Sequence, residues 1–522
     1  VINLIYAAGV RLRMLLMARI TNNILLEIRD ELYTHIQTLS FSFFDTRPAG
    51  KILARIIGDV NSLKDVLNDG VTKLIPNILT IIAILVIMMI KNIWLSLSAI
   101  LVLPLIAIGM YFIQIVAHKR WLTFRKKSSN VTAYIHEDFS GIRIIKSFTA
   151  EQESQGEFDR LLLEHQNSFI HAVRLADGFS AVIEVTWGIG TFLLYFIGIS
   201  VLGVDAVPIG TFTAFAMYLT MFWDPIQNLA GFYNKLITNL SAAERIFEIL
   251  DTPAEVADKP GVTELPPIKG EVTFDHVSFA YKKDGEKALE DIDLDIKSGE
   301  TIGIIGGTGS AKSSLVQLLP RLYDVTEGSV TIGGVDVRRY DLDTLRNNVA
   351  MVLQKNELFS GTIAENLRWG NPDATDAEIE DACKQACADE FIERFPDKYQ
   401  THIEQGGNNV SGGQKQRLCI ARALLKKPRI LILDDSTSAV DTATDAKIRH
   451  SFAEKIPGTT VFIIAQRISS VENADKVLVL DNGRVSGFDT PANLLKTNAI
   501  YQDVYNSQTK GSGDFDEKGG EA

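Results

Sequence analysis

A glycine-rich segment in the second half of the chain has the composition of a phosphate-binding loop. It follows the apolar segment 302–305, which is predicted to be a strand. Glycines let backbone N–H groups converge on phosphate oxygens, and a helix that starts after the loop presents its positive end to them. Lysine then reaches the terminal phosphates and the following serine can ligate Mg²⁺. The loop consists of Gly306, Gly307, Thr308, Gly309, Ser310, Ala311, Lys312, Ser313 and Ser314.

Ala311 stands where such loops usually carry glycine. Two interpretations are open from the sequence. The methyl group either fits a helical backbone at this position or distorts the phosphate cradle slightly.

Further polar motifs follow the loop in a fixed order. An amide, Gln354, stands in the segment 352–355, and the apolar segment 430–433 ends in Asp434. Between them lies the signature segment, which consists of Val410, Ser411, Gly412, Gly413 and Gln414. The segment 438–441 ends in Asp441. This ordered set resembles an ABC exporter half-transporter, in which a membrane domain and a nucleotide-binding domain are fused.

The resemblance implies a role for each motif, with ATP as substrate and Mg²⁺ as cofactor. Tyr281 would stack on adenine, although a plain strand aromatic is the alternative. Gln354 would sense Mg²⁺ and the γ-phosphate, and Asp434 would hold the hydration shell of the metal. Ser411 to Gln414 and Asp441 would act on the opposite subunit, because cassettes of this family sandwich ATP between one subunit's loop and the other's signature.

Two residues at the hydrolytic positions depart from the family pattern. Asp435 stands where hydrolytic subunits carry glutamate, and Gln466 stands where they carry histidine. A base displaced by about 1 Å can slow its reaction on the order of 100-fold. Glutamine can donate a hydrogen bond, but it cannot become cationic or shuttle a proton. Together with Ala311, these changes predict a degenerate ATP site on this chain.

A degenerate loop beside an intact signature predicts a heterodimer. The signature of this chain would complete the hydrolytic site of a second half-transporter, while its own loop holds ATP with little turnover. A homodimeric lipid or drug flippase and an ATP-gated regulatory protein are the alternatives. Drift at single positions would also explain each change alone.

Composition divides the chain into an apolar half and an acidic half. The 522 residues are 46% hydrophobic and carry a net charge of −12. Residues 1–250 hold 21 Lys or Arg and 20 Asp or Glu, so the acidic excess belongs to the remainder. A nucleic-acid partner is therefore not expected, because it would need a broad basic surface. Three cysteines give no disulfide framework.

Uncharged runs in the first half predict membrane-spanning helices in the cytoplasmic membrane. The runs cover residues 74–90, 93–117, 185–204 and 206–223, and about 20 such residues cross a bilayer as a helix. Positive charge gathers in the long connections, which are therefore predicted to be cytoplasmic together with the second half. The predicted fold is an all-α transmembrane domain followed by an α/β P-loop ATPase domain.

The predicted domains are 1–250 for the membrane part, 251–269 for a linker, 270–508 for the nucleotide-binding part and 509–522 for a disordered tail. An apolar start at Val1 indicates that a first span is missing.

The cytoplasmic connections resemble elements that couple the membrane part to the cassettes. The candidate coupling residues are Phe43, Phe44, Asp45, Gly141 and Arg143. Glu184 lies beside an uncharged span, where a carboxylate is costly in lipid, so it should face a cavity or a partner. It is a candidate contact for cationic cargo, with a structural hydrogen bond as the alternative. The exported substrate, whether small molecule, lipid or peptide, is not fixed by the sequence.

Overall fold

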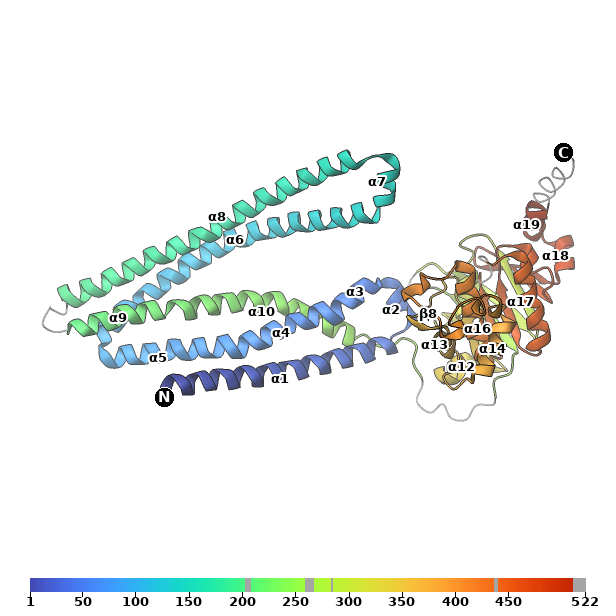
Figure 1. Cartoon of the computed structure of the whole chain (residues 1–522), viewed down its shortest axis with the longest axis horizontal. Helices are drawn as coiled ribbons and strands as arrows, with labels where there is room; N and C mark the ends of the chain where they lie inside the picture. Colours follow the sequence, from blue (N-terminus) through green and yellow to red (C-terminus); the bar gives the residue numbers. More distant parts are fainter. Residues whose placement is uncertain (202–207, 259–266, 283–284, 436–439, 510–522) are drawn as a thin grey trace. The chain divides into compact units, whose positions relative to one another are not determined.

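The computed structural model describes residues 1–201, 208–258, 267–282, 285–435 and 440–509 (Figure 1). The chain divides into two compact units. The first contains Val1–Leu32 and Leu53–Ile249, and the second contains Tyr33–Ile52 and Leu250–Ala522. The segment 33–52, predicted as part of the membrane domain, thus lies in the same unit as the nucleotide-binding part.

The first unit consists of helices, with three short π-helical turns between them (Figure 1). The helices that lie wholly or partly in this unit are α1 (Ile2–Thr38), α3 (Ala49–Ala54), α4 (Val60–Asp69), α5 (Ile75–Lys91), α6 (Ile93–Ser140), α7 (Ile142–Phe148), α8 (Glu151–Phe196), α9 (Ile209–Met221) and α10 (Trp223–Leu250). The π-turns are Arg55–Asp59, Gly70–Leu74 and Ile197–Val201.

The connection between α5 and α6 is a single residue. Asn92 has an extended backbone, and its side chain accepts hydrogen bonds from the N–H groups of Trp94 and Leu95. It therefore caps α6 and replaces two of the partners that a helix start lacks. Pro76 lies in the first turn of α5, where its missing N–H costs little. The turn between α5 and α6 is therefore tight.

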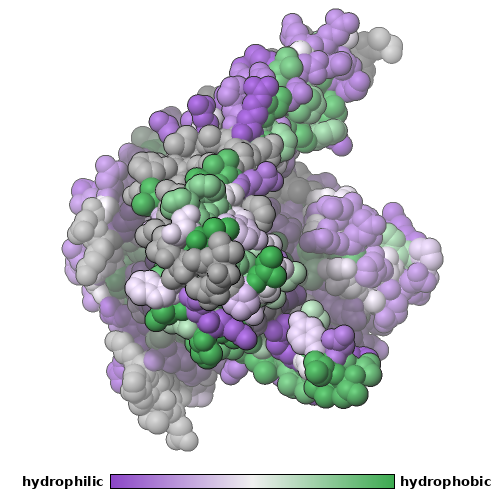
Figure 2. Space-filling view, turned by 90° about the vertical axis from the view of Figure 1, so that its left-hand side faces the viewer, coloured by the Kyte–Doolittle hydropathy of each residue, from purple (hydrophilic) through white to green (hydrophobic). Residues whose placement is uncertain are grey.

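Apolar side chains face outward from the first unit. In α5, Ile82, Val86 and Ile90 are half exposed or more. Figure 2 shows green hydrophobic patches on the end of the helices that it views. By length and composition, one described helical stretch, Ala49–Lys91, can cross a membrane, and Gly188–Ser200 is a shorter apolar helix. Most side chains of the predicted span 93–117 and residues 202–207 lie outside the described set.

Ion pairs join α4 and the π-turn before it to α10 within the first unit. Asp59 is buried and accepts two hydrogen bonds from Arg245, at 2.6 and 3.0 Å, and one from Arg55 at 2.9 Å. Ten residues along α4, Asp69 binds Lys235 at 2.7 Å. The partners on α10 are also ten residues apart, as an antiparallel helix pair requires. These contacts fix the register of the two helices.

The second unit is built around a six-stranded sheet in the order β12-β11-β3-β10-β9-β6. All neighbouring pairs are parallel except β11 and β12. Its strands are β3 (Thr301–Gly306), β6 (Val349–Val352), β9 (Ile430–Asp434), β10 (Thr460–Ile464), β11 (Lys476–Asp481) and β12 (Arg484–Asp489). Every residue of β9 and β10 is buried, which explains their unbroken apolar sequences.

An antiparallel sheet in the order β2-β1-β4-β5 covers part of this core, and β7 pairs with β8. These strands are β1 (Val272–Phe279), β2 (Leu289–Ile296), β4 (Glu327–Ile332), β5 (Val335–Asp336), β7 (Gly361–Thr362) and β8 (His402–Ile403). The helices are α2 (Phe41–Thr46), α11 (Lys312–Gln317), α12 (Leu342–Asn348), α13 (Ile363–Arg368), α14 (Asp376–Gln385), α15 (Asp389–Ile392), α16 (Gly412–Leu425), α17 (Thr442–Lys455), α18 (Pro491–Thr497) and α19 (Ala499–Thr509).

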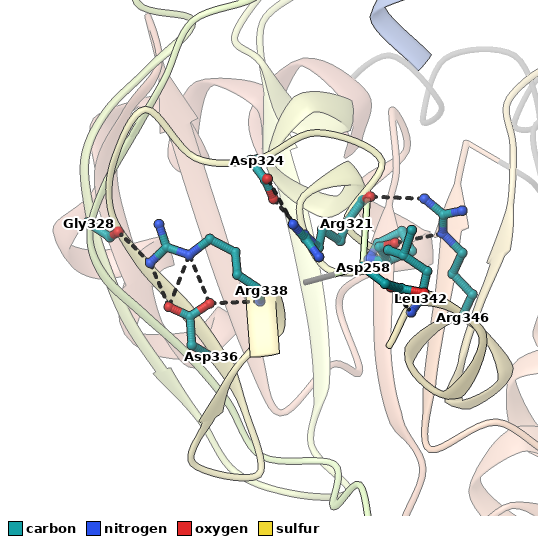
Figure 3. A network of polar contacts seen from close by, with 9 residues as sticks. Asp258, Arg321, Asp324, Gly328, Asp336, Arg338, Leu342 and Arg346 are labelled. Atoms are coloured by element: carbon teal, nitrogen blue, oxygen red, sulfur yellow. Dashed lines mark hydrogen bonds and ion pairs between the residues drawn. The ribbon is translucent and has the colours of Figure 1, made fainter. Parts of the chain in front are cut away.

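The described part of the predicted linker is attached to the second unit (Figure 3). Asp258 accepts a hydrogen bond of 2.8 Å from the N–H of Leu342 at the start of α12. On the same helix, Arg346 donates to the carbonyls of Pro320 and Arg321. An acidic side chain at a helix start stabilises it through the helix dipole. Asp258 of the linker is thus held by α12.

Candidate functional site

The carboxyl ends of three parallel strands bring the phosphate-binding loop, Asp435 and Gln466 together. Ile464 at the end of β10 is in register with Asp434 at the end of β9 and with Ile304 of β3. The loops that follow these strands carry Gln466, Asp435 and the phosphate-binding loop. In parallel α/β sheets, ligands bind at the carboxyl edge of the strands.

The phosphate-binding loop needs glycine where its backbone is left-handed. Gly309 has φ +84°, a conformation that side chains disfavour. At Gly306, which has φ +156°, a Cβ would lie 2.3 Å from the carbonyl oxygen of Leu480. Both positions therefore exclude larger residues.

Ala311 is also left-handed, with φ 67° and ψ 26°, and it immediately precedes α11. This excludes the interpretation in which its methyl group fits a helical backbone. A left-handed backbone costs a residue with a Cβ roughly 1–2 kcal/mol. The loop therefore holds a strained alanine at the position where glycine is usual.

We expect Ala311→Gly to stabilise the nucleotide-binding part by about 0.5–1 kcal/mol. Removing the strain gains roughly 1–2 kcal/mol, and the greater freedom of glycine in the unfolded chain takes back about 0.4–1 kcal/mol. Chemical denaturation followed by hydrogen exchange in the second unit measures the change. Ala446→Gly is the matched control: Ala446 is exposed and lies in the interior of α17, so the same replacement there should destabilise by about 1 kcal/mol. If the two replacements changed the free energy of unfolding in the same direction, Ala311 would not be strained.

Lys312 lies folded against the loop. Its Nζ donates to the carbonyls of Gly306 at 3.0 Å and Gly307 at 2.8 Å. Burial lowers the pKa of Lys312, while the carboxylates of Asp434 and Asp435 act in the opposite direction. The ammonium is thus beside the loop amides, where it can bind terminal phosphates.

Ser313 and Asp434 form a pair of oxygen ligands. The hydroxyl of Ser313 donates to Oδ1 of Asp434 at 3.1 Å. Burial raises the pKa of Asp434, which a nearby cation would counteract. Mg²⁺ prefers such oxygens, one or two from protein with the rest from phosphate and water. The donor set therefore fits Mg²⁺ bound together with a nucleotide.

Asp435 is held by two amide side chains. Nε2 of Gln466 donates to its Oδ2 at 2.8 Å, and Nε2 of Gln354 lies at 3.5 Å from the same oxygen. Its backbone is left-handed, with φ 48°, and its N–H donates to the carbonyl of Ile464. Burial raises the pKa of the Asp435 carboxyl, and the hydrogen bonds from both glutamines oppose that rise. The three candidate catalytic residues therefore form one cluster.

Tyr281 lies beside the helix that follows the loop. Its hydroxyl is 2.7 Å from the hydroxyl of Ser314, and the residue is 49% exposed. Tyr281 follows the end of β1 and packs edge-on against Phe279 and Tyr323. A partly exposed tyrosine at this place is compatible with stacking on adenine, which stays a prediction.

The signature segment begins α16 with a capping box. The Ser411 hydroxyl accepts from the N–H of Gln414 at 3.3 Å, and Oε1 of Gln414 accepts from the N–H of Ser411 at 2.9 Å. Ser411 and Gly412 are exposed. Within the part of the chain that the structure describes, no hydrogen bond or ion pair joins residues 411–414 to the phosphate-binding loop. Asp441 similarly caps α17 through the N–H of Thr444, whereas residues 438 and 439 lie outside the described set.

The first candidate coupling element, α2, lies on the second unit. Phe43 is buried, and Asp45 accepts a hydrogen bond from the hydroxyl of Tyr323. Burial and the Asp45 carboxylate raise the pKa of Tyr323, so the hydroxyl stays a donor at neutral pH. Phe44 is partly exposed. Tyr323 was not predicted as the contact of this element, because Tyr323 and Asp45 are 278 positions apart in the chain.

The second candidate coupling element and Glu184 belong to the first unit. Gly141 precedes α7, and Arg143 is exposed on it. Phe148 at the end of α7 is 78% exposed. Glu184 is exposed on α8. These positions agree with a surface or cavity role and do not select a ligand.

Two protein-family models match the chain. The one described as the transmembrane region of ABC transporters matches residues 1–226, and the one described as ABC transporter matches residues 289–438.

Curated relatives extend over nearly the whole chain. An uncharacterized ABC transporter ATP-binding protein, YknV of Bacillus subtilis, is 36% identical over 96% of this chain and 83% of its own length. A putative multidrug export ATP-binding/permease protein of the same organism, YgaD, is 35% identical over 93% of this chain and 84% of its own. An ATP-dependent lipid A-core flippase of Desulfotalea psychrophila is 33% identical over 95% and 86%.

A solved structure has the same arrangement of elements. It is that of a bacterial Atm1-family ABC exporter with ATP bound, with a TM-score of 0.80 and 26% identity. The match covers 96% of this chain and 87% of that one.

Proposed function

The chain belongs to the ABC transporters in which a transmembrane region and an ATP-binding domain are fused, and from this premise we propose that it is the degenerate-site half of a heterodimeric exporter. It is a membrane protein whose ATP-binding domain is cytoplasmic, and it couples ATP hydrolysis to export. Our proposal goes further and says which of the two ATP sites of the dimer hydrolyses ATP.

The observation that carries the proposal is the hydrogen bond of 2.8 Å from Gln466 to Asp435. A general base must have its lone pair directed at the water that it activates. Here Oδ2 of Asp435 accepts from a neutral amide, and the aspartate side chain is one methylene shorter than glutamate. Gln466 has no proton to give up near neutral pH. The geometry therefore favours binding of ATP at this site over its cleavage.

The remaining residues support nucleotide binding at the same site. Lys312 and the loop amides would hold the phosphates, and Tyr281 would stack on adenine. Ser313, Gln354 and Asp434 would hold Mg²⁺, which neutralises phosphate charge when bound. The site thus keeps the residues that would bind the nucleotide, while the two residues at the hydrolytic positions, Asp435 and Gln466, are changed.

The signature supports a role toward a second half-transporter. Gly412 and Gly413 begin α16, so their N–H groups belong to the positive end of a 14-residue helix. The capping box holds this end in place and leaves Ser411 exposed. An anion such as the terminal phosphate of ATP on a partner's loop is the ligand that this end favours.

Transmission to the membrane part would pass through α2. Asp45 and Tyr323 are joined directly, and Ser42 donates to Glu255 at 2.5 Å. A displacement of the ATP-binding core therefore moves the end of α1. Gly141 and Arg143 would serve a second contact through α7, and Glu184 remains a candidate contact for cationic cargo.

The cargo that we propose is a small or amphipathic molecule or a lipid, because one relative is named for multidrug export and another for flipping lipid A-core; a peptide is the alternative from the sequence. A homodimeric flippase is the second candidate, because one relative at 33% identity is an ATP-dependent lipid A-core flippase. An ATP-gated regulatory protein is the third. Transport into vesicles against a gradient separates pumping from gating.

The test of the heterodimer is purification of the tagged chain from its own membranes. We expect a second half-transporter to be recovered in equal amount, and the complex to hydrolyse ATP. The chain expressed alone should show little turnover, because both of its sites would then be degenerate. A homodimer that hydrolyses ATP at the rate of the native complex would contradict the proposal.

A further inference from the structure

The last helix of the described chain contacts the loop that carries Gln466. Oε1 of Gln508, in the final turn of α19, accepts a hydrogen bond of 2.8 Å from the N–H of Ile468. Its Nε2 donates to the carbonyl oxygen of Gln466, also at 2.8 Å. One side-chain amide thus spans Gln466 to Ile468, here called the post-β10 loop.

The chemistry of this contact is that of a strand pairing. A primary amide offers a donor and an acceptor side by side, like a peptide group. Arg467, between the two bonded residues, has the extended backbone φ −101° and ψ 129°. Two bonds to an extended segment fix both its position and its rotation about its own axis. The backbone from which the Gln466 side chain projects is therefore held from outside the loop.

The helix that presents Gln508 is itself anchored. Tyr501 is 1% exposed, and Val504 and Tyr505 pack against the same hydrophobic core as β9 and β10. The N–H of Tyr501 donates to the side chain of Asn498, which in turn binds Ser486 on β12. The helix can therefore act as a fixed support.

We propose that Gln508 is a positioning residue for the ATP site of this chain. By holding the post-β10 loop, it keeps the Gln466 amide on Oδ2 of Asp435 and at the place where it meets bound ATP. This rests on the proposed function, because it takes Gln466 as a residue that contacts ATP. The consequence is that retention of ATP at the degenerate site depends on the C-terminal helix, 42 residues beyond the loop.

The experiment compares Gln508→Ala with Gln502→Ala in the full-length complex. Gln502 is on the same helix and also donates from its side-chain amide to a backbone carbonyl, that of Leu495 at 2.9 Å. It is a matched control because its bond is not to the post-β10 loop. Hydrogen exchange of the Ile468 amide reports the loop. Retention of radiolabelled ATP with Mg²⁺ after rapid dilution reports the site.

We expect Gln508→Ala to speed exchange at Ile468 and to shorten ATP retention, each by about tenfold, because two hydrogen bonds are lost. Gln508→Glu should protect Ile468 more than alanine does, because it keeps the acceptor, yet shorten retention as much, because it removes the donor to Gln466. Gln502→Ala should change neither quantity.

Two outcomes would overturn the proposal. One is a Gln508→Ala protein that matches Gln502→Ala in both measurements. The other is faster exchange with unchanged retention while Gln466→Ala does shorten retention, since Gln508 would then be only structural. If Gln466→Ala leaves retention unchanged, the assigned role of Gln466 fails instead, and exchange at Ile468 still decides whether Gln508 holds the loop.

Discussion

Replacing Asp435 by Glu together with Gln466 by His is expected to raise ATP turnover at this chain's own site by on the order of 100-fold. The glutamate extends the carboxylate by one methylene toward the water. Replacing Gln466 removes the amide that donates to the carboxylate at position 435, a hydrogen bond of 2.8 Å in the unchanged chain. Histidine adds a group that can become cationic near neutral pH. Because residues 435 and 466 contact each other, their replacements are not independent. We therefore expect the rate gain of the double variant to exceed the product of the gains of the two single variants.

The measurement is single-turnover hydrolysis in the complex whose other site has been inactivated. The single variant Asp435→Glu should gain less, because Gln466 still donates to the carboxylate. The second unit provides a matched control on α14, where Nε2 of Gln385 donates to Oδ2 of Asp381 at the same 2.8 Å. The double change Asp381→Glu with Gln385→His should leave turnover unchanged. An Asp435→Glu, Gln466→His protein with the original rate would count against the proposed cause of the defect.

The sequence predicted the elements of the site better than the contacts within it. The strands that end at Gly306, Asp434 and Ile464 are buried on both faces, so their apolar runs were readable without a structure. The candidate loop, metal-binding and signature residues were predicted from motifs of local spacing and from the family resemblance, and their roles stay predictions. The fold class, fused membrane and ATP-binding parts, is confirmed by the family matches and the solved exporter structure.

Contacts between distant residues could not be predicted in the same way. The hydrogen bond from Gln466 to Asp435 joins residues 31 positions apart, and the one from Gln508 to Gln466 joins residues 42 apart. Both depend on which strands are neighbours and on the exact path of a loop. The left-handed backbone of Ala311 could not be predicted for a related reason. A single residue can adopt the right-handed or the left-handed helical conformation, depending on its surroundings.

A substitution in the signature segment should reduce ATP turnover of the complex far more than a substitution in the phosphate-binding loop of this chain. Gly412→Asp puts a negative charge at the first position of α16, where the partner's ATP would bring its own phosphates. We expect turnover to fall on the order of 100-fold or more, as when one donor to a developing charge is lost. Lys312→Met on this chain should leave most of the turnover in place, because its own site contributes little.

Misfolding would not produce this contrast. An acidic residue at the start of a helix stabilises it through the helix dipole. α14 already carries Asp376 at its first position, behind the capping box of Thr375 and Glu378, which matches that of Ser411 and Gln414. The substitution should therefore leave α16 folded, which hydrogen exchange across residues 412–425 checks. Equal losses from Gly412→Asp and Lys312→Met would mean that the two sites hydrolyse alike, and the asymmetric assignment would then be wrong.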